Sequence, residues 1–196
     1  MADLICVFAA SSNAVDKKYV DLAYRLGEAL AQADYGLVFG GGRIGLMGAC
    51  ARGVASRSGR IVGVIPEKLN RPGIAYERCD ELIETRTMHE RKSTMESLCA
   101  GFIALPGGFG TLEELLEVIT LKQLGYHCLP IVILNYGGFY DPLIDQLDRC
   151  IGERFTNESW RGLYFCAEGI GEALEYLCAY RPGEFPDKME EALSSK

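Results

Sequence analysis

The sequence predicts an α/β fold of the Rossmann-like, doubly wound type, with a mainly parallel sheet and helices on both faces. Two observations support this prediction. Short, continuously apolar segments alternate with segments of helical periodicity, and two of the apolar segments end in glycine-rich turns. The 196 residues, 48% of them hydrophobic, suffice for one domain with its own core. We expect a single domain over 1–196 with a polar C-terminal tail from about residue 182.

The apolar segments predict the strands of this sheet. They are short and rich in β-branched or aromatic residues, and no polar residue interrupts most of them. The first, LICVFAA, lacks preceding basic residues, so we expect a strand there and not a signal peptide. The predicted strands cover 4–10, 35–42, 60–66, 81–85, 101–108, 129–135 and a short segment at 163–166.

Helical periodicity marks the segments between the strands. Tyr19, Leu22, Leu26 and Leu30 lie on one face of the first helix, which Gly36 ends. Small residues dominate the second helix, which indicates close packing against its neighbours. The predicted helices cover 16–36, 44–59, 88–100, 111–125, 140–152 and a segment after the last strand, whereas 67–79 is expected to be a loop.

Composition excludes several classes of function. Lys and Arg number 20 against 27 Asp and Glu, and a net charge of −7 argues against sequence-independent binding of nucleic acid, though not against a small anionic ligand. The only histidines, His89 and His127, form no HExxH motif, so we expect no metal. Without an apolar run of roughly 18 residues, no membrane span is expected.

The eight cysteines form no CxxC pair, and most lie in apolar segments. Such cysteines are typical of buried thiols in a reducing compartment and not of a disulfide framework or a metal site. We therefore expect a cytoplasmic protein.

The first glycine-rich turn, Gly40 to Gly45, matches the pattern GxGxxG. Its glycines, Gly41 and Gly42 among them, would let the backbone approach a phosphate at a helix N-terminus. The motif alone is weak, because glycine turns of this kind also serve packing. An NAD site remains possible but unsupported, because the next strand ends in Pro66 and Glu67. The sequence contains neither a P-loop nor a GxSxG nucleophile motif.

The second turn, Pro106-Gly-Gly-Phe-Gly-Thr-Leu-Glu-Glu114, follows an apolar strand and opens a strong helix. Its free amides and the helix dipole would form an anion site. Thr111 and Glu114 also have the spacing of a capping box, in which Glu114 would only bond back to the Thr111 amide. Because two carboxylates would repel a phosphate, at least one of Glu113 and Glu114 should face another part of the ligand.

A helix over 88–100 carries Met88, Arg91, Lys92, Met95 and Leu98 on one face. A buried guanidinium needs an anionic partner. Arg91 and Lys92 either clamp a phosphate, or extend to the rim of the face, or pair with Glu96 or a distant carboxylate. We expect His89 to be a polar surface residue.

Together, MHERK at 88–92 and PGGFGTLEE at 106–114 resemble the LOG family, long labelled "possible lysine decarboxylase" and now recognised as cytokinin riboside 5′-monophosphate phosphoribohydrolases. Further segments that resemble the family are FGGGRIGLMG (39–48), GVIP (63–66), GFIALPGGFGTLEELLEVIT (101–120), QLG (123–125) and GFYDPL (138–143). Residues 67–87 match no family pattern that we identify.

The resemblance implies hydrolysis of an N⁶-substituted AMP to the free base and ribose 5-phosphate, without a cofactor, by a homodimer. It implies that Arg91 and Glu114 are catalytic. The phosphate would bind at Gly107, Gly108, Gly110 and Thr111, and Met88, Lys92, Glu113 and Thr120 would line the substrate pocket.

Two other functions stay open: hydrolysis of AMP or another nucleoside monophosphate, and a non-catalytic nucleotide or cofactor carrier on the same fold. A pyridoxal-phosphate-dependent decarboxylase has little support, because no lysine stands out as a Schiff-base former and Lys92 lies beside an arginine.

Overall fold

Seven parallel strands form one sheet in the order β4-β3-β2-β1-β5-β6-β7. The computed structural model describes residues 2–183 and 185, so the predicted polar tail lies almost entirely outside the described residues. The strands are β1 (Leu4–Phe8), β2 (Gly36–Phe39), β3 (Ile61–Pro66), β4 (Glu81–Thr85), β5 (Gly101–Ala104), β6 (Ile131–Leu134) and β7 (Phe165–Ala167). The predicted Rossmann-like fold class is confirmed.

Helices follow most of the strands, as the alternating pattern predicts. They are α1 (Lys17–Gln32), α2 (Gly45–Ser56), α3 (Met88–Leu98), α4 (Phe109–Gln123), α5 (Asp141–Gly152) and α6 (Ile170–Ala179). Two 3₁₀ segments, η1 (Tyr136–Gly138) and η2 (Glu158–Leu163), were not predicted. Because η2 occupies the start of the predicted strand at 163–166, β7 begins only at Phe165.

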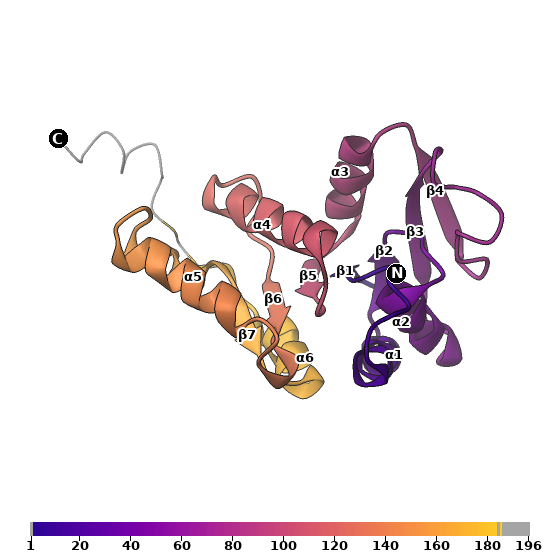
Figure 1. The fold of residues 1–196 in the computed structure, drawn as a ribbon, viewed down its shortest axis with the longest axis horizontal. Coiled ribbons are helices and arrows are strands. Elements are labelled where there is room, and N and C mark those ends of the chain that lie inside the picture. The colour runs from indigo at the N-terminus through magenta and orange to yellow at the C-terminus, as the bar shows by residue number, and fades with distance from the viewer. Residues whose placement is uncertain (1, 184, 186–196) are drawn as a thin grey trace.

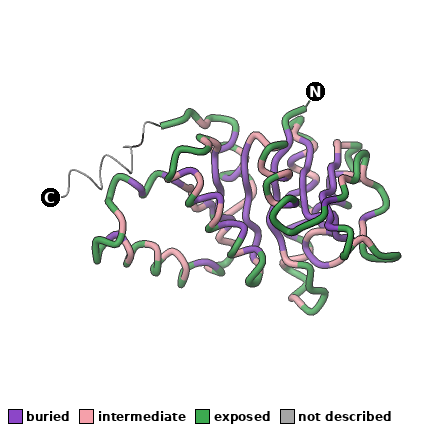
Figure 2. Tube along the Cα trace, turned by 90° about the horizontal axis from the view of Figure 1, so that it is seen from above, coloured by how far each residue is buried: buried purple, intermediate pink, exposed green. Residues whose placement is uncertain are grey.

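Alternate residues of the central strands face two separate cores. Ile5 and Val7 of β1 pack with residues of α1, α2 and α6, whereas Cys6 and Phe8 pack with residues of α3, α4 and η2. The helices therefore lie on both faces of the sheet, as Figure 1 shows. The buried segments run through the middle of the molecule, and the outer helices are exposed on one side (Figure 2).

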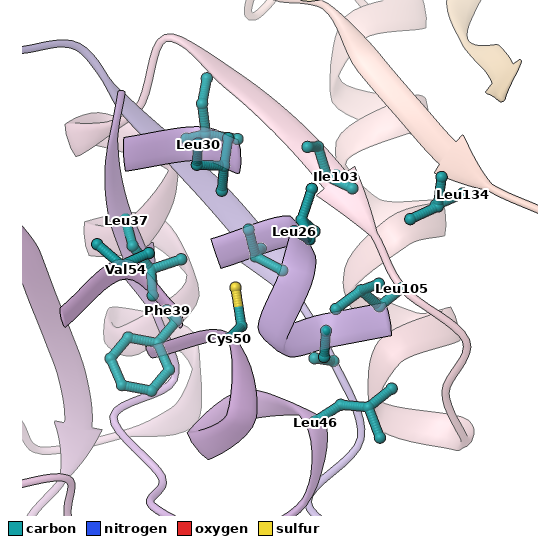
Figure 3. Packing of buried hydrophobic residues seen from close by; sticks show 14 of the residues in the cluster. Leu26, Leu30, Leu37, Phe39, Leu46, Cys50, Val54, Ile103, Leu105 and Leu134 are labelled. Carbon is teal, nitrogen blue, oxygen red and sulfur yellow. The ribbon is translucent and has the colours of Figure 1, made fainter. Parts of the chain in front are cut away.

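Helices α1 and α2 pack unusually close together. A Cβ atom on Gly27 would lie 2.1 Å from the Cys50 carbonyl oxygen, and one on Gly53 would lie 2.0 Å from that of Tyr24. Both glycines are therefore required by helix packing, which confirms the close packing predicted for the small-residue helix. Figure 3 shows Cys50 of α2 among the leucines of this core, near Leu26 of α1.

The cysteine prediction is only partly right. All eight are free thiols, but just Cys6 and Cys50 are fully buried, while Cys128 and Cys178 are exposed. Cys128 lies in the loop before β6, and Cys178 lies near the end of α6, so one side of each meets solvent. No helix among the described residues is long and apolar enough to cross a membrane.

The strand order shows at which end of the sheet a ligand would bind. From β1 the chain proceeds outward through β2, β3 and β4, then returns to β5 on the other side of β1 and continues to β6 and β7. The carboxyl ends of β1 and β5 therefore form the topological switch point, where ligands bind in open parallel sheets. Both glycine-rich turns begin at this edge, after β2 and after β5.

Candidate active site

Arg91 is a buried cation on α3, with only 7% of its surface exposed. Thr87 begins this helix, and its side chain accepts a hydrogen bond from the Glu90 backbone N–H. The Arg91 Nε atom donates to the Val64 carbonyl oxygen of β3 at 3.2 Å. Arg91 is therefore held across the carboxyl end of the sheet by a backbone acceptor.

Glu114 of α4 is the anionic partner of Arg91. Its Oε1 atom lies 2.8 Å from Arg91 Nη1, and only 8% of the residue is exposed. Burial raises the pKa of Glu114, and the charge and hydrogen bond of Arg91 oppose that rise. The sequence left open whether Arg91 clamps a phosphate, extends to the rim, or pairs with a carboxylate. In the structure it pairs with a carboxylate distant in sequence, that of Glu114.

The capping-box alternative for Glu114 is wrong. Helix α4 begins at Phe109, with Gly108 as its N-cap and no side-chain cap, so Thr111 lies inside the helix. The Thr111 side chain packs instead on the turn, so close that a Cβ on Gly107 would lie 2.2 Å from its Oγ1 atom. Glu114 consequently has no part in capping the start of the helix.

Lys92 forms a second ion-pair cluster beside this pair. Its Nζ atom bonds to Glu113 and lies 2.7 Å from Glu117 Oε2, one turn further along α4. Burial alone would lower the pKa of Lys92, but the two carboxylates outweigh it and raise the pKa. Glu96 lies nearby, and burial together with Glu117 raises its pKa to about 7.

The first glycine turn closes around Arg91. A Cβ atom on Gly40 would lie 1.8 Å from Arg91 Nη2, so only glycine leaves room for the guanidinium there. Gly41 has a φ of +70°, and it follows Gly40 directly at the end of β2. The glycine turn that the sequence predicts to approach a phosphate therefore lies against the Arg91–Glu114 pair.

The second glycine turn presents bare backbone at the N-terminus of α4. Neither Gly108 nor Gly110 has a positive φ, and Cβ atoms at these positions would meet nothing within 4 Å. Packing and conformation within the described chain therefore require neither glycine. The first amides of the helix have no partners within it, and the missing side chains leave space in front of them.

Two of the predicted residues lie apart from this centre. Thr120 is exposed on α4, two turns beyond Glu113, and its hydroxyl donates to the Leu116 carbonyl oxygen at 2.8 Å. Met88 is half exposed at the start of α3. His89 is exposed, as predicted.

Several residues at this site escaped the sequence analysis. Val64 contributes only a carbonyl oxygen, so its side chain carries no signal. Asn13, in the loop after β1, accepts a hydrogen bond from the Gly45 N–H at 2.8 Å at the start of α2. The available signal was the polar segment Ser11-Ser12-Asn13 that follows the first apolar segment. The predicted loop 67–79 packs on the first glycine turn, where the Tyr76 N–H donates to the Gly41 carbonyl oxygen.

Within residues 2–183 and 185, no group of three or more His, Cys, Asp or Glu side chains is arranged to hold a metal ion. This edge of the sheet carries the cations Arg91 and Lys92, their partners Glu113, Glu114 and Glu117, and the free backbone amides at the start of α4.

Comparison with known structures bears on the fold. The molybdenum cofactor binding protein of Rippkaea orientalis has a TM-score of 0.71 and 19% identity, covering 91% of this chain and 97% of that one. The molybdenum cofactor carrier protein of Chlamydomonas reinhardtii has a TM-score of 0.69 and 21% identity, covering 92% and 100%. At this identity the likeness establishes a shared fold alone.

Sequence relatives bear on the family. The model described as "possible lysine decarboxylase" matches residues 47–177. The chain is 41% identical to the cytokinin riboside 5′-monophosphate phosphoribohydrolase LOG2 of Arabidopsis thaliana, covering 94% of this chain and 88% of the relative. It is 42% identical to the corresponding enzyme LOG of Oryza sativa subsp. japonica, covering 91% and 74%. With Arg91, Lys92 and Glu114 gathered beside both glycine turns, this chain belongs to the LOG family.

Proposed function

We propose that this protein hydrolyses the N-glycosidic bond of N⁶-substituted adenosine 5′-monophosphates, releasing the free base and ribose 5-phosphate. The observation that carries the proposal is the buried Arg91–Glu114 pair at the sheet's switch point, between two glycine turns. The relatives that share most of the chain are phosphoribohydrolases by name, which supports the same substrate class.

The reaction breaks the bond between ribose C1′ and the base nitrogen through a state with positive charge on the ribose. A carboxylate beside C1′ stabilises this charge and orients the water whose oxygen bonds to C1′, while the base leaves with a proton. Glu114 is the candidate for this carboxylate. Burial raises the pKa of Glu114, and Arg91, fixed by Val64 and Gly40, opposes that rise and so favours the ionised carboxylate.

The phosphate of the substrate would bind at the start of α4. Gly108 and Gly110 leave open space before the free amides, and Thr111 offers a hydroxyl close by. Lys92 pairs with Glu113 and Glu117, which offsets part of the repulsion between these carboxylates and a phosphate. Glu114 would face the ribose through the oxygen that Arg91 does not bind. Binding energy from the phosphate would then orient the ribose for attack.

A turnover panel tests this function. We expect N⁶-isopentenyl-AMP to yield free base and ribose 5-phosphate, with a higher kcat/KM than AMP, and we expect the matching ribosides without phosphate to react far more slowly. Chromatography of the bases together with an assay for ribose 5-phosphate measures both products. Folded protein that releases no base from either nucleotide would refute the proposal, and preference for AMP would change the substrate to AMP itself.

We further propose that two copies associate through the outer face of α4 and that the protein is cytoplasmic. This face carries Phe109, 94% exposed, with Leu116 and Leu124, 40% and 45% exposed, and Thr120 lies between them. A second copy with the same apolar stripe would cover it, and Thr120 would then lie at the interface. The eight free cysteines support a reducing compartment.

Leu116→Glu is expected to halve the particle mass, because a charge would be buried in the paired helices. Size-exclusion chromatography with light scattering measures the mass. Leu69→Glu, at a residue 51% exposed in the loop after β3, is the matched control and should leave the mass unchanged. Equal masses for the wild-type protein and Leu116→Glu would contradict the proposed interface.

A further inference from the structure

Tyr140, just before α5, lies beneath the turn that precedes α4. Only 2% of the residue is exposed. Its hydroxyl donates to the Leu105 carbonyl oxygen at 2.6 Å. Burial raises the pKa of Tyr140 and the nearby backbone of Gly107 opposes that rise, so the phenol keeps its proton and donates it to Leu105. The hydroxyl is thus bonded to the residue before Pro106 and lies beside the residue after it.

Tyr140 is itself firmly held. Its backbone N–H donates to Asn135 Oδ1 at 2.7 Å, and Asn135 Nδ2 donates to Asp141 Oδ1 at 2.7 Å. The Phe139 ring packs edge to face on the Tyr140 ring, with centroids 5.0 Å apart. Since Asn135 directly follows β6, the neighbour of β5 in the sheet, these bonds fix the tyrosine to the strand beside the turn.

The other side of the turn is bounded by Thr111. Gly107 lies so close to it that a Cβ would reach 2.2 Å from Thr111 Oγ1, whereas Gly108 and Gly110 face open space. The turn is therefore fixed from below by a hydroxyl and from the helix side by a threonine, while its open side carries the bare backbone. A loop fixed on two sides holds its amides in place before any ligand arrives.

We propose that Tyr140 is a positioning residue for the phosphate of the substrate: its hydroxyl sets the Leu105–Gly107 turn, and thereby the amides of Gly108 to Gly110 that bind the anion. The inference rests on the proposed function. No sequence motif indicated this role, because it depends on which strand lies beside β5.

The test is Tyr140→Phe in the full chain, which removes one oxygen and keeps the ring. We expect KM for the nucleotide and Ki for ribose 5-phosphate and for inorganic phosphate each to rise about tenfold, or about 1.4 kcal/mol. We expect kcat at saturation to change less than about threefold, because Glu114 is untouched. A merely structural role would lower the melting temperature and leave Ki unchanged, so a Ki within about twofold of the wild-type value overturns the proposal.

Tyr180→Phe is the matched control. Its hydroxyl also donates to a backbone carbonyl, that of Cys128 at 2.9 Å, but just before β6 begins, at the edge of the sheet opposite the glycine turns. We expect this variant to keep the wild-type Ki. A tenfold rise in both variants would mean that lost stability explains the effect, which would overturn the positioning role.

Asn135→Ala is the second variant for this test, in case Tyr140→Phe does not fold. It removes the hydrogen bonds that hold the Tyr140 backbone and should raise the same Ki about threefold, and no rise would overturn the proposal.

Titration calorimetry with inorganic phosphate separates this inference from the proposed function. If the wild-type protein binds phosphate but hydrolyses nothing, the function fails and the comparison of dissociation constants still decides the role of Tyr140. If it binds no phosphate, the inference fails.

Discussion

Glutamine in place of Glu114 is expected to lower kcat about 10²–10⁴-fold, the range for loss of a catalytic carboxylate, while KM changes little. Glutamine has nearly the same shape and can still accept a bond from Arg91 through its amide oxygen. It cannot balance positive charge on the ribose in the transition state. Steady-state kinetics with N⁶-isopentenyl-AMP measures the effect, and circular dichroism checks the fold.

Glu28→Gln is the control for this loss. Glu28 also pairs with an arginine, Arg57, at 3.1 Å, but the two residues lie on α1 and just after α2, away from the glycine turns. This variant should keep its full kcat. If Glu114→Gln retained more than about a tenth of the wild-type kcat, Glu114 would be a structural partner of Arg91 and another group would have to assist the reaction.

Methionine in place of Arg91 is expected to destabilise the fold by about 3–5 kcal/mol and to abolish turnover. Methionine fills much of the volume of the arginine stem but leaves the Glu114 carboxylate buried without a counter-charge. The pKa of Glu114 should then rise further, because the charge and hydrogen bond of Arg91 would no longer oppose the effect of burial. Urea unfolding measures the loss of stability, and the turnover assay measures the loss of activity.

The double variant Arg91→Met with Glu114→Gln separates two causes of the loss of stability: the missing arginine itself, and the Glu114 carboxylate left without a counter-charge. Neutral glutamine needs no cation, so the double variant should lose less stability than the sum of the two single losses, with a coupling energy of about 1–3 kcal/mol. Turnover should stay abolished. If the losses of stability were simply additive, the two side chains would not interact in solution as their 2.8 Å contact indicates.

Much of the fold could be predicted because strands buried on both faces need continuous apolar runs. The runs that contain Ile5 and Val132 have this pattern, and each lies in the strand predicted for it. The start of α4 was harder to predict. Threonine three residues before glutamate is typical of a capping box, yet the helix begins two residues earlier, at Phe109, because Gly108 already supplies an extended N-cap.

The sequence could name candidate residues for the site but not the geometry that brings them together. Arg91 needed an anionic partner on general grounds, but the choice among Glu96, Glu114 and more distant carboxylates depends on how α3 and α4 pack over the sheet. Only the family resemblance joined Arg91 to Glu114 in advance. Loop 67–79 gave no periodic pattern, and its position depends on backbone hydrogen bonds such as that from Tyr76 to Gly41.

The Arg91 guanidinium occupies the space where a side chain on Gly40 would lie. This contact matters when related sequences are judged by their motifs. A chain can keep both the Arg-Lys pair and the Pro-Gly-Gly turn and yet carry alanine at the position of Gly40. Its guanidinium would then be displaced by a methyl group that lies 1.8 Å from Nη2 in this geometry. Such a sequence would keep these two motifs and still lack the geometry that joins Arg91 to Glu114 in this structure. The glycine and the arginine, far apart along the chain, therefore form one joint marker of this arrangement.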